Sequence, residues 1–377
     1  MGRGSAQVLA VGAFFFLPVA VLSSQGLTLL LVLLGLGSLI VSRQPSLLLG
    51  VGRAVPVLFG LVVAVAVVTS GWAVSPADAL RLSASLAVLF VLILVLLGSA
   101  HQATAMQRNR LGAWLVAGFA VGSAILAVEL ATDLPLANLL RGPRPGEDDL
   151  ERSLLNPALT VLVLMAWPVG FVVWRREKWA VALVALAVIS VLSLGDSVTV
   201  WVAAGASVAA FGIVAAFGGR GARALGIAAA IAVLAGPLFP QVVTPERMEQ
   251  ALEGVRPSAI HRIYTWDFTA QRIAEKPLMG WGLDSSRNIP GGDILVVENG
   301  PALSLHPHNG GLQVWLELGA LGALALAALL WVTGRAMGRL SRSSQAPAAA
   351  TFVAAFVFVS LSFGIWQNWW IAALGLT

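Results

Sequence analysis

The chain has 377 residues, of which 58% are hydrophobic and 11% are charged, and its mean hydropathy is +0.88. This composition excludes a soluble globular protein, because apolar runs of about 20 residues recur along the whole length, as in membrane-spanning helices. The net charge of +5 has to be divided between two membrane faces, which argues against a nucleic-acid partner. The lack of cysteine excludes disulfides, thiolate catalysis and cysteine-bound metals.

The apolar segments predict eleven membrane-spanning helices. At the N-terminus a retained first hairpin is favoured over a signal peptide, because a second apolar run follows closely and no small-residue cleavage site separates the two. The predicted spans are residues 8–22, 27–41, 54–74, 82–99, 111–130, 157–174, 179–194, 198–217, 224–239, 312–332 and 348–374. The last is long enough to contain a break near Gly364. We therefore predict an all-α polytopic membrane protein with about 11–12 transmembrane helices.

These spans divide the chain into three parts. Residues 1–239 hold the N-terminal helices, residues 240–311 form one large polar loop, and residues 312–377 hold the C-terminal helices. Within the loop, proline at a first helical position predicts a short helix from Glu246 to Glu253. Apolar residues at helical spacing predict a second helix from Ser258 until Pro277 stops it, and this helix is expected to lie along the membrane surface.

The charges of the short loops favour a cytoplasmic N-terminus. In this orientation the inner loops carry twelve basic residues and Glu177 as their only acid, whereas the other seventeen acidic residues lie at or beyond the outer face. The large polar loop is then extracytoplasmic. Tryptophans near span ends, Trp366 among them, are expected to form an interfacial belt.

The polar loop concentrates the residues that can carry chemistry. Titratable groups are costly near a bilayer, so a loop that gathers three of the four histidines is expected to use them. A histidine such as His306 or His308 can take a proton near neutral pH and so activate a hydroxyl. Guanidinium groups bind phosphate oxygens in a fork, so Arg262 and Arg287 suit a lipid-linked phosphate or diphosphate. Together they predict transfer from a phosphorylated lipid to an acceptor hydroxyl.

The same residues have structural interpretations. His306 can simply hold the turn before the next span, and a loop arginine can meet lipid phosphate without any catalytic role. A His-x-His pair can bind a metal, but the third ligand would have to be Asp293, His261 or Glu317, without any recognisable spacing. Nothing resembles a phosphate-binding glycine loop. We expect neither a metal nor another cofactor.

One pattern resembles the signature of the O-antigen ligase family. It consists of His308 and Asn309, nine further residues, Gly319, two residues and Gly322. The upstream residues that resemble the same family are Arg262, Trp266, Ile273, Pro277, Leu278, Gly280, Trp281 and Gly282, and residues 282–292 are most similar to ligase-like sequences of alphaproteobacteria. The specific part of the match covers roughly 60 residues and points to the superfamily more strongly than to ligase over polymerase.

The resemblance implies a substrate pair and a mechanism. The expected donor is a glycan on undecaprenyl diphosphate, and the expected acceptor is a lipid A core hydroxyl on the periplasmic side of the bacterial inner membrane. His308 would be the catalytic base and Arg262 would engage the diphosphate; the further substrate-binding candidates are Arg287, His306, Asn309 and His261. A single displacement from a donor with its own leaving group would invert the anomeric centre without a metal or a general acid.

One departure and three alternatives accompany this prediction. Many relatives carry Ser-Arg at the outer start of a central helix, where this chain has Asp196 and Ser197, so one donor contact is missing or replaced. A polymerase of the same superfamily would share the site and differ in its acceptor. A secondary transporter would need ionisable residues in mid-helix, which are nearly absent. A non-catalytic envelope partner would not need the paired histidines and arginine.

Overall fold

The structure is a computed structural model that describes residues 3–42, 52–132, 134–141, 152–245, 247–248, 257–298 and 300–377. The helices of the first half are α1 (Arg3–Leu22), α2 (Gly26–Ser42), α3 (Ala54–Thr69), η2 (Ser70–Trp72), α4 (Pro76–His101), α5 (Ala105–Ala131), α6 (Pro135–Arg141) and α8 (Asn156–Trp174). They continue as α9 (Ala180–Ser193), α10 (Val198–Phe217), α11 (Gly219–Leu234), η3 (Gly236–Leu238) and α12 (Phe239–Val242). The last part holds α14 (Pro257–Glu275), η4 (Ser285–Arg287), α15 (Gly310–Met337), α16 (Arg342–Leu361) and α17 (Asn368–Leu376), and one small hairpin, β1 (Leu295–Val297) with β2 (Gly300–Pro301).

The predicted all-α polytopic architecture is confirmed, since each predicted span corresponds to a helix. Within the described ranges, eight helical segments are long and apolar enough to cross a membrane: α1, α3 continued by η2 (Ala54–Trp72), α4, α5, α8, α10, α15 and α16. A ninth span results if α11 and the following segment, bent by 56°, count as one. Helices α2 and α9 are apolar but have only 17 and 14 residues. Whether these two cross the membrane, and hence the total of 11–12 spans, stays a prediction.

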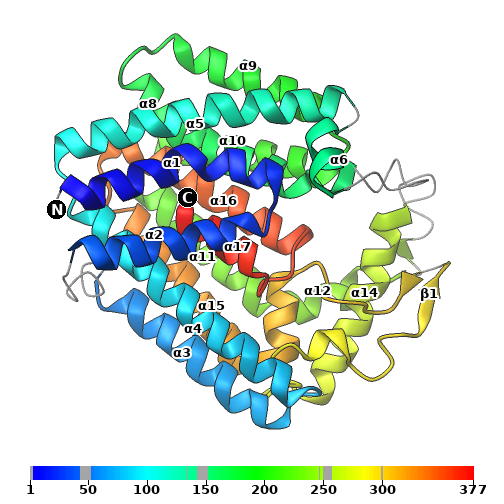
Figure 1. Cartoon of the computed structure of the whole chain (residues 1–377). Coiled ribbons are helices and arrows are strands. Elements are labelled where there is room, and N and C mark those ends of the chain that lie inside the picture. Colours follow the sequence, from blue (N-terminus) through cyan, green and yellow to red (C-terminus); the bar gives the residue numbers. More distant parts are fainter. Residues whose placement is uncertain are drawn as a thin grey trace.

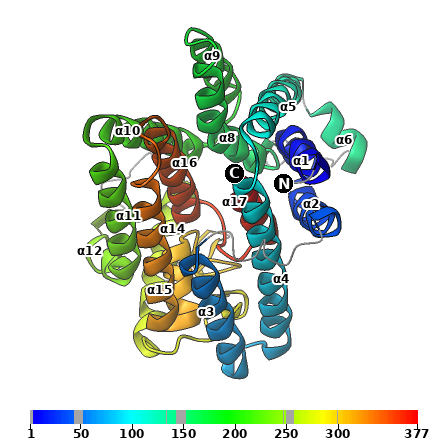
Figure 2. The same ribbon diagram turned by 90° about the vertical axis from the view of Figure 1, so that its left-hand side faces the viewer.

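Close packing of small residues brings the central helices together. Helices α11 and α15 lie side by side, as do α10 with α16 and α1 with α5 (Figures 1 and 2). A Cβ atom on Gly226 would lie only 2.6 Å from the Cα atom of Gly334, so the α11 and α15 backbones touch. Such contacts stabilise membrane helices where apolar burial gives no preference over lipid.

The contacts between loops agree with the predicted alternation of sides. On the predicted inner side, Arg176 donates to the Asn109 carbonyl at 3.0 Å. On the predicted outer side, the Val74 backbone N–H donates to Ser285 Oγ at 3.1 Å. Each contact joins two segments that the topology puts on the same side. Which side faces the cytoplasm stays a prediction, as does the three-part division of the chain.

The large polar loop lies at one end of the helical bundle, where Figure 1 shows α12, α14 and β1 together. Helix α14 confirms the helix predicted between Ser258 and Pro277. Apart from residues 247–248, the short helix predicted over 246–253 lies outside the described residues. The predicted break near Gly364 is confirmed, because α16 ends at Leu361 and α17 begins at Asn368. The connection between them runs past the polar loop.

Candidate active site

The segment His306–Asn309 is fixed between helices α14 and α15. Asn309 begins α15 as its N-cap, with its side-chain oxygen accepting the backbone N–H of Leu312 at 3.0 Å. From the other side, Trp266 of α14 donates its indole N–H to the Pro307 carbonyl at 2.8 Å. The two histidines are thus presented by a loop that is tied at both ends.

His308 has one ring nitrogen engaged and the other available. Its Nδ1 lies 2.8 Å from the backbone carbonyl of Ser362, in the connection between α16 and α17. Because a carbonyl oxygen only accepts, Nδ1 carries the proton and Nε2 keeps a lone pair in the neutral ring. The backbone of His308 adopts a φ of 51°, a left-handed conformation that is uncommon outside glycine and that clusters at functional sites. This arrangement suits a general base.

His306 supports its neighbour from inside the loop. The ring centroids of His306 and His308 are 4.4 Å apart, and the His308 backbone N–H donates to His306 Nδ1 at 3.2 Å. Burial lowers the pKa of His306 to about 3, with further contributions from the charges of His308, Arg287 and Arg262. His306 is therefore neutral at physiological pH and holds the His308 backbone, whereas its predicted role in binding substrate stays a prediction.

The environment also keeps His308 in its neutral form. Burial lowers the pKa of His308 below its usual value, the hydrogen bond to Ser362 opposes this shift, and electrostatic interactions with Arg262 and His261 add to it. A neutral imidazole with a free nitrogen can accept a proton.

Arg262 is a half-buried guanidinium that has no counter-ion among the described residues. It lies on α14, and burial lowers its pKa. In the part of the chain that the structure describes, it forms neither an ion pair nor a hydrogen bond. Desolvated charge without a partner is unfavourable, and an incoming anion would relieve this cost.

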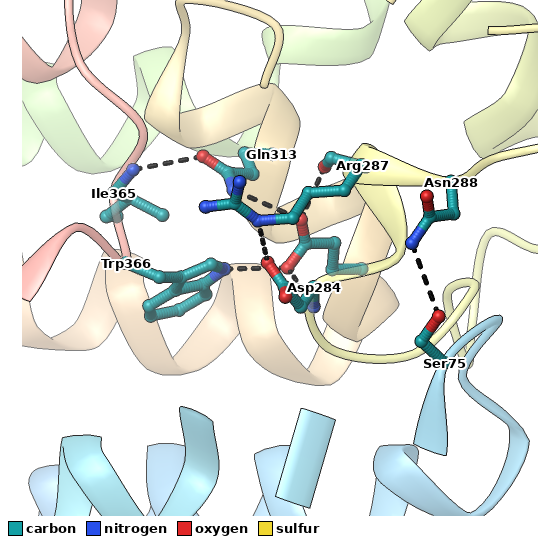
Figure 3. A network of polar contacts seen from close by, with 9 residues as sticks. Ser75, Asp284, Arg287, Asn288, Gln313, Ile365 and Trp366 are labelled. Atoms are coloured by element: carbon teal, nitrogen blue, oxygen red, sulfur yellow. Dashed lines mark hydrogen bonds and ion pairs between the residues drawn. The ribbon is translucent and has the colours of Figure 1, made fainter. Parts of the chain in front are cut away.

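Arg287 and Asp284 form an ion pair at the edge of a small cavity. Arg287 Nε donates to Asp284 Oδ1 at 2.9 Å (Figure 3). Burial raises the pKa of Asp284, and the contact with Arg287 opposes that rise. The cavity, of about 80 Å³, is lined by Leu82, Asp284, Arg287, Leu305, His306, Gln313, Gly364, Trp366 and Gln367. Arg287 and His306 thus reach one space, although they are distant in sequence.

The predicted residues Asn309 and His261 both bond to backbone atoms. Asn309 caps α15, and His261 Nε2 donates to the Pro301 carbonyl at 2.8 Å, which ties α14 to the hairpin. Contact of either side chain with substrate stays a prediction. Among the described residues, no three His, Cys, Asp or Glu side chains are grouped closely enough to hold a metal ion.

Several residues that sequence reasoning missed surround the predicted ones. Glu317 was considered only as a third metal ligand, yet its buried carboxylate accepts a 2.7 Å hydrogen bond from the Trp366 indole N–H. Trp366 was expected in an interfacial belt; that prediction is wrong, because its side chain is only 8% exposed and its polar atom points inward (Figure 3). Ser362 carried no sequence signal at all, since it acts through its backbone carbonyl.

Arg152 lies near the position where the sequence departs from the family pattern. Arg152, from the segment before α8, lies with its Nη1 3.8 Å from Asp196 Oδ2 at the outer start of α10. Both side chains are exposed, so this ion pair is weak. It nevertheless brings an arginine from another part of the chain to the position where a Ser-Arg sequence is absent.

Comparisons with known proteins cover the same region. Residues 157–327 match the family model described as O-Antigen ligase. A Rickettsia conorii protein named "Putative polysaccharide ligase" is 27% identical over 291 residues, which are 75% of this chain and 69% of that relative. A Rickettsia bellii protein of the same name is 33% identical over 142 residues, and one from Rickettsia prowazekii is 32% identical over 140 residues; both alignments cover 36% of this chain and 35% of the relative.

No solved structure matches the chain. The region that matches the family model includes α14 and α15, and with them Arg262 and the segment His306–Asn309. The helical membrane architecture, this matched region and the similarity to polysaccharide ligases agree with one another. Together they support the assignment of this chain to the O-antigen ligase family.

Proposed function

We propose that this protein transfers a glycan from undecaprenyl diphosphate to a hydroxyl of lipid A core on the periplasmic side of the bacterial inner membrane. One observation carries the proposal: within the described parts of the chain, a neutral His308 keeps Nε2 free and lies within the electrostatic influence of a half-buried Arg262 that has no counter-ion there. A base under the influence of a guanidinium that can accept an anion fits a reaction in which a hydroxyl attacks a carbon that bears a diphosphate. Similarity to the O-antigen ligase family supports glycan transfer as the reaction class.

In this mechanism His308 is the general base. Its Nε2 takes the proton of the acceptor hydroxyl while the hydroxyl oxygen bonds to the anomeric carbon of the donor. The bond between that carbon and the diphosphate oxygen breaks, and the diphosphate departs with the electron pair. The Ser362 carbonyl, which accepts from Nδ1, then stabilises the imidazolium until the proton passes to water or to the leaving diphosphate.

Arg262 stabilises the negative charge of the departing diphosphate. It also links donor binding to the strength of the base. The positive charge of Arg262 lowers the pKa of His308, so a bound diphosphate that neutralises this charge makes His308 a stronger base. Arg287 is a second candidate for the diphosphate, but its charge is already paired with Asp284.

The stereochemistry follows from the number of displacements. One attack by the acceptor hydroxyl inverts the anomeric centre, whereas a covalent intermediate would retain it. Because a diphosphate is a good leaving group, the mechanism needs neither a general acid nor a metal ion. We therefore infer a metal-independent inverting glycosyltransferase without a cofactor.

Transfer by the purified protein tests the proposal. The reaction contains undecaprenyl-diphosphate glycan, lipid A core and EDTA, and the product is analysed for its anomeric configuration. We expect a chelator-resistant, inverted product with wild type and none with His308→Ala. Glycan chains that lengthen on the polyprenyl carrier while lipid A core stays unmodified would instead establish a polymerase. Absence of both products from folded protein that binds the donor would overturn the catalytic proposal.

A further inference from the structure

We propose that Glu317 is a positioning residue that holds the Asp284–Arg287 pair and the connection carrying Ser362 in the arrangement needed for transfer. This inference rests on the proposed function, since it names what keeps that site assembled. Glu317 lies on α15, faces no solvent and is not itself expected to touch substrate. Its partners come from three separate parts of the chain.

The Glu317 carboxylate accepts four hydrogen bonds. Oε1 accepts from the hydroxyl of Ser286 and, at 3.1 Å, from the side-chain amide of Gln313. Oε2 accepts from the backbone N–H of Asp284 at 2.8 Å and from the indole N–H of Trp366 at 2.7 Å. Figure 3 shows three of the partners, Asp284, Gln313 and Trp366, which come from the loop around η4, from α15 and from the connection before α17.

These four partners favour a carboxylate over any neutral side chain. Indole and backbone N–H groups only donate, and the amide orientation of Gln313 is fixed because its oxygen accepts the Ile365 N–H at 3.0 Å. An ionised carboxylate has four acceptor positions, which matches this set. A glutamine at this position would turn one NH₂ group toward donors and leave buried donors unpaired.

A break in α15 adds a second attachment at the same residue. Gly319 has a φ of 63°, and this non-helical residue frees the backbone carbonyls before it. The Glu317 carbonyl accepts the Gly282 N–H at 2.9 Å, and the Leu316 carbonyl accepts the Trp281 N–H at 2.8 Å. The backbone and the side chain of Glu317 therefore bind the same loop.

The two segments held by Glu317 are those that serve the candidate site. Asp284 directly contacts Arg287, so the bond to the Asp284 N–H fixes the start of the turn that presents this arginine. Trp366 lies in the connection that begins with Ser362, whose carbonyl orients His308. Loss of the carboxylate is expected to move both segments together.

Glu129 is a matched control for a purely structural glutamate. It is 2% exposed and accepts two backbone N–H bonds, from Leu136 at 2.7 Å and Ala137 at 3.0 Å, at the start of α6. None of its described contacts involves the candidate site. Glu129→Gln should therefore leave transfer within about twofold of wild type, since a residual acceptor oxygen remains.

Two measurements on Glu317→Gln in detergent or nanodiscs test the proposal. Hydrogen exchange should rise in residues 282–288 and 362–367 and stay unchanged in α14. In the transfer assay, kcat/KM for the donor should fall about 100-fold, as expected for displaced binding groups. The double variant with Arg287→Ala should be no slower than the slower single variant, because both changes remove the same positioned arginine. Trp366→Phe, which removes one donor only, should shift both measurements in the same direction by less.

The outcomes separate this inference from the proposed function. If the losses of kcat/KM in Glu317→Gln and Arg287→Ala multiply in the double variant, Glu317 acts only by stabilising the protein in general and the inference is overturned. Unchanged hydrogen exchange in both segments for Glu317→Gln and Trp366→Phe would overturn it as well. If wild type transfers no glycan, the proposed function fails. Hydrogen exchange then still decides whether Glu317 holds the two segments.

Discussion

Two polar regions of this protein, around Glu317 and around Arg262, differ in one respect. The Glu317 carboxylate is fully buried and its acceptor positions are filled by four donors, whereas Arg262 is half-buried and has no partner among the described residues. His308 lies between these extremes, with Nδ1 bonded to Ser362 and Nε2 free. Buried polar groups are normally satisfied, so a satisfied group indicates support and an unsatisfied one indicates a place for a ligand.

Removing the free base should have the largest effect on transfer. His308→Ala is expected to lower kcat by about 10³-fold, within the range for general bases. His308→Gln is the matched variant, because its amide can still donate to the Ser362 carbonyl while it cannot take a proton. Both should fold and both should be inactive in the assay with purified donor and acceptor. Activity retained by His308→Gln would show that His308 orients the loop without serving as base.

Substitution of Gly319 is the most direct way to disrupt the region around Glu317. An added Cβ would lie 2.3 Å from the Leu278 carbonyl oxygen, and the combination of φ 63° and ψ −160° costs about 1–3 kcal/mol for residues other than glycine. Gly319→Ala should lower the thermal midpoint of the detergent-solubilised protein and the yield of folded material. Gly212→Ala in α10, where an added Cβ meets nothing within 4 Å, should leave both unchanged. Equal effects of the two substitutions would contradict the role given to the helix break.

The unpaired cation is tested by comparing two arginines. Arg262→Ala should lower kcat/KM for the donor by about 10²-fold to 10³-fold, as for other groups that stabilise developing charge. Arg287→Ala should have a smaller effect, since Asp284 already compensates its charge. The same ranking is expected for binding of undecaprenyl diphosphate. A larger loss at Arg287 would assign the diphosphate to Arg287 instead of Arg262.

The pH dependence of kcat/KM reports the electrostatic environment of His308. Its folded pKa is below the usual value, so the neutral base persists as pH falls past the ordinary histidine range, and kcat/KM decreases only at lower pH. Arg262→Gln removes a positive charge, raises the pKa of His308 and should move the acid limb to higher pH. The acid limb of the kcat/KM profile is measured at a donor concentration well below KM. An unmoved limb would show that another group titrates.

His261 should give the smallest effect. Its Nε2 already donates to the Pro301 carbonyl, and glutamine can replace that single bond. His261→Gln should change kcat/KM by less than about tenfold, in line with one hydrogen bond. The donor KM is the sharper measurement, because a rise confined to KM would favour the predicted contact between His261 and substrate.

The sequence alone determined the class of protein and the chemical centre of the site. Backbone groups in lipid must be satisfied within a helix, so membrane spans can be recognised as apolar runs. Each predicted run is helical here, and the last, residues 348–374, is divided between α16 and α17. Ionisable residues stand out against such a background, which is why Arg262 and His308 were found and why the family pattern around His308 was recognisable. Helix α14 was also predictable, because its period and its stop at Pro277 are local signals.

Tertiary structure decided which polar groups support the site and which remain free for a ligand. Glu317 is one acidic residue in an apolar stretch. Its partners Ser286 and Trp366 are 31 and 49 residues away in the sequence, so no local sequence pattern predicts these contacts. Trp366 fits an interfacial belt by position and is buried instead, while Ser362 contributes only a carbonyl that every residue possesses. Hydrogen-bond satisfaction depends on three-dimensional neighbours, and these arise only when the break at Gly319 and the connection after α16 bring distant segments together.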